Sequence, residues 1–102
     1  MTIGSAAAAF FAGMFLANFV PHFIKGVCGD KFPTPFATPS GKGLSSARLN
    51  VAWALLNLVV GYFLFLAGKV SGGSCSALVV FFAGIAAISI IMSINFQQKQ
   101  PR

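Results

Sequence analysis

The stretch LNVAWALLNLVVGYFLFLA, residues 49–67, decides the fold predicted for this chain. It contains no Asp, Glu, Lys or Arg, and a helix of about 20 such residues crosses the roughly 30 Å hydrocarbon core of a bilayer. Two further runs, residues 3–24 and 77–94, are similarly long and free of these charged residues. We therefore predict three transmembrane helices with spans at 3–24, 49–67 and 77–94, and a long loop at 25–48.

The composition supports lipid as the solvent of this fold. The 102 residues are 57% hydrophobic and 8% charged, whereas a soluble domain is about a quarter charged. So short a chain supplies few strands for a closed barrel, which leaves helices as the way to satisfy the backbone in lipid. The first run is too long for a secretory signal and has no basic residue before it. We predict an all-α membrane protein with one transmembrane domain over residues 1–102.

The basic residues predict how the helices are oriented. Basic residues concentrate in short loops on the cytoplasmic side, and the second connector carries only Lys69. The expected orientation has the N-terminus out and the C-terminus in, with the 25–48 loop in the cytoplasm. We expect the loop residues to bind anionic lipid rather than nucleic acid, at about 1 kcal/mol per basic group. The remaining basic residues are Lys25, Lys31, Lys42 and Arg48 in the loop, and Lys99 and Arg102 in the tail.

The two cysteines are predicted to lie on opposite sides of the membrane. Cys28 follows the first span and Cys75 precedes the third. An intrachain disulfide is not expected, because the two Cα atoms would have to lie within about 7 Å. Cys75 faces the oxidising side, where it either pairs between chains or, in the interpretation we favour, is a small buried hydrophobe.

A polar seam runs along the second helix. Its members fall on one narrow face at 100° per residue. Asparagine in lipid is costly unless it bonds across helices, so this face is expected to contact protein. The members are Asn50, Ala54, Asn57, Gly61 and Gly68.

The other two helices carry small-residue faces of their own. In the first helix Asn18 and His22 lie on a separate face, and His22 is expected at the polar, interfacial end of the helix. Small residues let helices approach closely. The small-residue faces are Ala9, Gly13 and Ala17 in the first helix, and Val79, Ala83, Ala86, Ser89 and Ser93 in the third.

The segment KFPTPFATPSGKGLSS, residues 31–46, predicts a structured loop. Its prolines favour extended, polyproline-like backbone. We favour a cap over the helix ends, and the alternative is a docking surface for a partner. That surface would consist of Phe32, Pro33, Pro35 and Phe36.

The sequence offers little catalytic chemistry. Asp30 is the only acidic residue, so no carboxylate pair exists for acid–base work. No G-x-S-x-G nucleophile motif is present, and SGKG at residues 40–43 lacks the flanking residues of a phosphate loop. His22, Cys28 and Asp30 follow no recognised metal-ligand spacing. We expect no enzymatic activity, no metal and no cofactor.

Several segments resemble a family of small multi-span bacterial inner-membrane proteins. The likeness is carried by NFVPHFIKG at residues 18–26, FPTPFATPSGKGLSS at 32–46, NVAW at 50–53, and Asn57 with Gly61 and Tyr62. It covers about residues 18–62. The resemblance implies a multi-pass protein of the bacterial inner membrane with no assigned activity, and it supplies no catalytic or binding residues.

Two functions agree with these observations. We favour an accessory or structural subunit of a homo-oligomer or a larger membrane complex, because three short spans bury little surface alone and more packing faces exist than three helices need. The alternative is an oligomeric small-solute or proton transporter or channel. Its path would be lined by Asn18, His22, Asn50 and Asn57.

Overall fold

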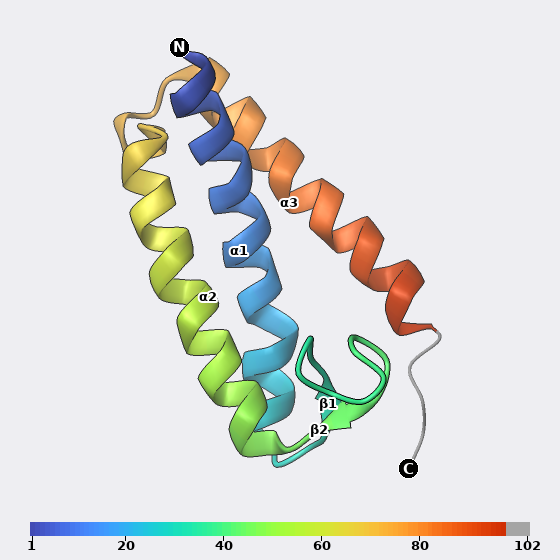
Figure 1. Ribbon diagram of the computed structural model, residues 1–102. Coiled ribbons are helices and arrows are strands. Elements are labelled where there is room, and N and C mark those ends of the chain that lie inside the picture. The colour runs from blue at the N-terminus through green and yellow to red at the C-terminus, as the bar shows by residue number, and fades with distance from the viewer. Residues whose placement is uncertain (98–102) are drawn as a thin grey trace.

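Three long helices make up most of the computed structural model, which describes residues 1–97 (Figure 1). They are α1 (Ile3–Val27), α2 (Ala47–Ala67) and α3 (Cys75–Phe96). Each is long and apolar enough to cross a membrane. The prediction of three such helices is confirmed, and each predicted span lies inside one of them. Between α2 and α3 the chain makes one short 3-10 turn, η1 (Val70–Gly72).

Each helix begins at a hydroxyl side chain that accepts a hydrogen bond from a free backbone N–H. Thr2 and Ser5 form a reciprocal capping box at the start of α1. Ser46 Oγ accepts from the Leu49 N–H at 3.1 Å at the start of α2, and Ser74 caps α3 in the same way. Such caps stabilise a helix by about 1 kcal/mol each, so the sequence fixes where the helices start.

The loop between α1 and α2 is folded. Its strands β1 (Phe32–Pro33) and β2 (Leu44–Ser45) pair antiparallel, with Phe32 opposite Ser45. Between them the chain turns back on itself, and the Thr34 carbonyl accepts from the N–H groups of Ala37 and Gly41. The segment is therefore structured, as expected. Its backbone is extended at β1 and β2, whereas hydrogen-bonded turns rather than a polyproline-like run lie between them.

Helix α1 lies between the other two helices (Figure 1). It runs beside α2 along most of its length, whereas α3 crosses near the N-terminal half of α1 and diverges toward the loop. At the crossing, a Cβ on Gly13 would collide with the Phe81 carbonyl oxygen, and a Cβ on Gly84 with the Phe10 carbonyl oxygen. The two helices therefore touch backbone to backbone, as small residues allow.

The small-residue face noted for α3 is not the face that α3 packs against the rest of the chain. Helix α3 buries Ala77 and Gly84 instead, and Val79 of the predicted face is 62% exposed. Ser89 and Ser93 are exposed as well. Because α3 is apolar on every side, its periodicity does not identify a buried face. The close approach of Gly84 to the backbone of α1 sets which face of α3 contacts α1.

The two cysteines are free and lie at opposite ends of the bundle. Cys28 caps the end of α1, and Cys75 begins α3. Both are exposed, so the interpretation of Cys75 as a buried small hydrophobe is wrong for a single chain.

Candidate functional site

Asn50 ties α2 to the loop and to α1 through one buried amide. Its Nδ2 donates to the carbonyl oxygens of Phe32 at 2.9 Å, Ser46 at 3.0 Å and Ser45 at 3.3 Å. Its Oδ1 lies 2.7 Å from His22 Nδ1. Because an amide oxygen only accepts, His22 Nδ1 must carry the hydrogen, and Nε2 is then the acceptor of the neutral ring.

His22 is therefore a core residue rather than an interfacial one. Its side chain is 2% exposed, and its ring also meets the ring of Phe32, with centroids 5.4 Å apart. The expectation of His22 at a polar helix end is wrong. The loop folds back over the end of α1 and covers the imidazole, which sequence spacing alone does not reveal.

A second polar contact joins α1 to α2 one turn further into the bundle. Asn18 Nδ2 donates to Asn57 Oδ1 at 3.0 Å, and Asn57 Nδ2 donates to the Trp53 carbonyl at 2.8 Å. Gly61, one turn beyond Asn57, packs so closely that a Cβ there would meet the Leu16 side chain. All members of the polar seam are buried, so this face of α2 contacts protein.

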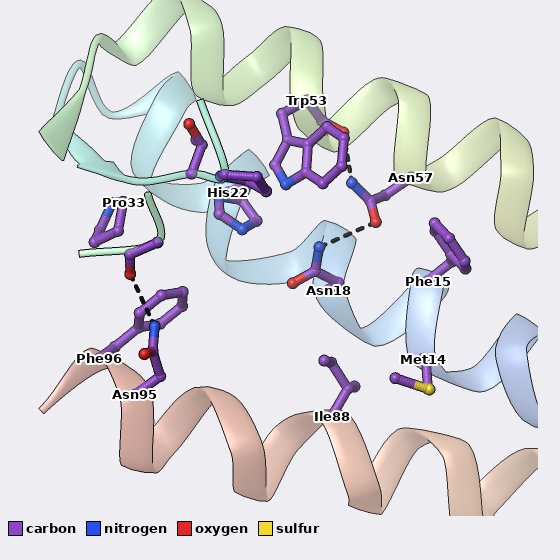
Figure 2. Close-up of a pocket in the computed structure, with 13 residues that line it drawn as sticks. Met14, Phe15, Asn18, His22, Pro33, Trp53, Asn57, Ile88, Asn95 and Phe96 are labelled. Carbon is purple, nitrogen blue, oxygen red and sulfur yellow. Dashed lines mark hydrogen bonds between the residues drawn. The ribbon is translucent and has the colours of Figure 1, made fainter. Parts of the chain in front are cut away.

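A cavity of about 350 Å³ opens beside these contacts, where α3 separates from α1 (Figure 2). Asn18 and His22 reach it from α1, Trp53 from α2, Ile88 and Phe96 from α3, and Pro33 from the loop. The Trp53 indole nitrogen is buried and is the one such side-chain nitrogen or oxygen within residues 1–97 that has no hydrogen-bond partner. The cavity thus combines an apolar lining with an unpaired donor.

The end of α3 closes the cavity against the loop. Asn95 Nδ2 donates to the Gly41 carbonyl at 2.8 Å, and the rings of Phe96 and Phe32 meet edge to face with centroids 4.8 Å apart. Sequence reasoning passed over Asn95 and Trp53 as cavity residues. A lone asparagine at the end of an otherwise apolar helix was the available signal, because such a side chain requires a partner.

The four predicted docking residues of the loop divide into two pairs. Phe32 is 7% exposed and Pro33 is fully buried, so their assignment to a docking surface is wrong, since both pack inward. Pro35 is exposed. Phe36 is 61% exposed, although its ring lies 5.2 Å from that of Trp53, centroid to centroid. The loop therefore packs Phe32 and Pro33 inward against the helix ends and presents Pro35 and Phe36 outward.

A second hollow lies on the outer side of α1 and α3. This outer groove, of about 640 Å³, is lined by Ala17, Val20 and Pro21 of α1 and by Ile85, Ser89 and Ser93 of α3. Its lining is apolar or weakly polar, and small side chains occupy both walls. The groove exists because α3 diverges from α1 beyond the glycine crossing.

Most of the described charged residues lie at the loop end of the molecule, and Lys69 lies at the other end, before η1. Lys25, Lys31 and Arg48 are exposed, and Lys42 is half-buried. Lys99 and Arg102 lie outside the described residues. Asp30 is exposed, and within residues 1–97 no three His, Cys, Asp or Glu side chains gather in a way that could hold a metal.

No family model, no curated protein and no solved structure matches this chain. The resemblance to small bacterial inner-membrane proteins therefore stays a prediction. The geometry of the bundle, the cavity and the outer groove is the basis for the proposals that follow.

Proposed function

We propose that this protein is a small multi-pass membrane protein that acts as a non-catalytic subunit of a homo-oligomer or of a larger membrane complex. The observation that supports this proposal is the outer groove. The polar side chains of α1 and α2 bond to each other inside one chain, whereas the groove beside α3 has nothing seated in it among residues 1–97. The groove is the place where a further transmembrane helix would pack.

The groove suits a helix better than it suits lipid alone. Transmembrane helices associate through small residues that let their backbones approach, often with hydroxyl side chains bonding across the interface. Ala17 and Ser89 supply small residues from the two walls, and Ser93 supplies a hydroxyl. The Ser93 hydroxyl now donates to its own helix at the Ile90 carbonyl, 2.8 Å away. This hydroxyl can rotate to bond with a partner helix at little cost in free energy.

Native mass spectrometry tests this function on protein extracted from its own membrane, without overexpression. We expect a complex of fixed stoichiometry, either of identical chains or with other proteins. Ser89→Leu should dissociate it by filling the groove. Ala83→Leu is the matched control, because Ala83 is exposed on α3 outside the groove lining. A stable monomer in native lipid would overturn the proposal.

Transport is a second candidate function, and one observation favours it. Asn18, His22 and Asn57 line a single cavity, which gives a small solute or a proton polar contacts within the bundle. The test is flux of protons or a neutral solute into liposomes that contain the protein. Flux equal to that of empty liposomes would remove this candidate.

We further propose that the N-terminus faces out and the loop faces the cytoplasm of a bacterial inner membrane. The basic residues at the loop end support this orientation, and they would contact anionic lipid there. The exposed thiols allow a direct test. In intact spheroplasts, a membrane-impermeant maleimide should label the Cys28→Ser variant through Cys75, and should label Cys75→Ser only after permeabilisation. The reverse pattern would overturn the orientation.

A further inference from the structure

A residue in the wall of the cavity carries a hydrogen-bond donor without a partner among residues 1–97. The Trp53 indole nitrogen is buried without a partner, and an indole N–H donates but cannot accept. A buried donor without an acceptor is unfavourable, so native structures nearly always provide a partner. An acceptor atom that enters the cavity from outside the chain would satisfy Trp53.

A hydrogen-bond acceptor lines the same cavity. His22 Nδ1 is committed to Asn50, and within residues 1–97 this is the hydrogen bond that the imidazole makes. Its Nε2 is consequently an open acceptor. The His22 and Trp53 rings stand edge to face with centroids 6.5 Å apart, and both side chains line the cavity (Figure 2). A single group that can both accept and donate a hydrogen bond would pair with the Trp53 indole N–H and with His22 Nε2.

The remaining lining defines the body of the ligand. Met14, Phe15, Ile88 and Phe96 surround the space, and no charged residue lines it within the described part of the chain. A cavity of about 150 Å³ in another protein is large enough for benzene, and this one measures about 350 Å³. It has room for a molecule of roughly two fused rings or a comparable length of hydrocarbon.

We propose that this cavity binds a neutral, membrane-soluble alcohol or phenol with an apolar body. The hydroxyl oxygen accepts from the Trp53 indole N–H, and the hydroxyl hydrogen is donated to His22 Nε2. A single water molecule can make the same two bonds, but it would leave most of the apolar space unfilled. This ligand site does not depend on the subunit role proposed above, because every lining residue belongs to one chain.

The test uses Trp53 itself, which is the only tryptophan in the chain. In protein labelled with ¹⁵N, its indole N–H gives a single identifiable NMR signal in lipid nanodiscs. We expect 1-naphthol to shift this signal downfield in a saturable manner. Naphthalene, which lacks the oxygen, should bind about tenfold more weakly, since one net hydrogen bond is worth about that factor.

A third probe and two kinds of variant complete the design. 1-Methoxynaphthalene accepts from Trp53 but cannot donate to His22, so it should bind more weakly than 1-naphthol. Ile88→Phe fills the cavity from α3 and should abolish the saturable shift, and Met14→Phe should do so from α1. Ile91→Phe is the matched control, because Ile91 is exposed on α3. It should bind like the unaltered protein.

Three results would overturn the proposal. An indole signal that does not respond to 1-naphthol would mean that water alone occupies the cavity. An equal response to naphthalene would mean that the hydroxyl is not recognised. A saturable shift that persists in both cavity-filling variants would place the probe elsewhere on the protein.

Discussion

Both helix contacts of α1 include close approaches at glycines, but they differ in their polar side-chain bonds. Toward α2, asparagine and histidine side chains form buried hydrogen bonds at the His22–Asn50 and Asn18–Asn57 pairs. Toward α3, two glycines bring the backbones into contact, and beyond that crossing the helices separate. The first contact is directional and extends to the loop, whereas the second is local and apolar.

This difference explains where hollows form. Hydrogen bonds at two levels, together with close glycine approaches, hold α1 and α2 side by side and antiparallel. The glycine crossing acts as a pivot for α3, and beyond it the divergence of α3 from α1 leaves the cavity and the outer groove. The α1–α2 contact thus extends along the helices, whereas the α1–α3 contact is confined to one crossing and leaves hollows beyond it.

The largest effect is expected for Asn50→Leu. The substitution leaves the His22 Nδ1–H and the Phe32 carbonyl buried without their partner, and each such group costs about 1–3 kcal/mol. We expect unfolding in detergent to require about 3 kcal/mol less, and trypsin to cut faster at Lys31 in the loosened loop. Ala52→Leu, on the exposed side of the same helix, should change neither quantity. Unaltered stability in Asn50→Leu would show that the amide does not hold the loop.

Gly84→Ala should be the next largest change. The added Cβ meets the carbonyl oxygen of Phe10, which is backbone and cannot move aside. Overpacking of this kind costs about 1–3 kcal/mol, measured as the free energy of unfolding. Gly72→Ala is the matched control, because a Cβ at Gly72 meets nothing within 4 Å. Equal stabilities of the two variants would contradict a pivot at Gly84.

A double-mutant cycle with Asn18→Leu and Asn57→Leu measures the second hydrogen bond between α1 and α2. Such bonds between membrane helices average about 0.6 kcal/mol, because the unfolded chain in the membrane also finds partners. We expect a coupling free energy of about that size. A coupling free energy near zero would show that the 3.0 Å hydrogen bond between Asn18 and Asn57 does not stabilise the fold. The polar stabilisation of the α1–α2 interface would then come from Asn50.

The smallest effect is expected for Phe36→Ala at the loop tip. Phe36 is 61% exposed, so the change in stability should be about 0.5 kcal/mol, the lower end for an aromatic pair. Its ring covers Trp53, and its removal should shift the tryptophan emission to longer wavelength. Phe63→Ala is the control, since Phe63 is 65% exposed on α2. An unchanged emission in Phe36→Ala would show that the loop does not cover the indole.

The parts that sequence predicts well are those set by local periodicity. The three helices follow from the apolar runs, and the buried face of α2 follows from asparagines and glycines repeating at 100° per residue. The contact of α3 does not, because a helix that is apolar all round has no periodic signal. His22 and Asn50 are 28 residues apart in the chain. Their pairing depends on how the loop folds back, which no local pattern specifies.

The hydrogen bond from Asn95 to Gly41 joins residues 54 positions apart, and it has a consequence for the order of synthesis. Every residue of the His22–Asn50 and Asn18–Asn57 contacts is synthesised before α3 begins. The helical hairpin and its loop can therefore assemble first, with their polar groups already paired. Ile88, Asn95 and Phe96 come later in the chain, so the residues of this scaffold precede those that complete the cavity.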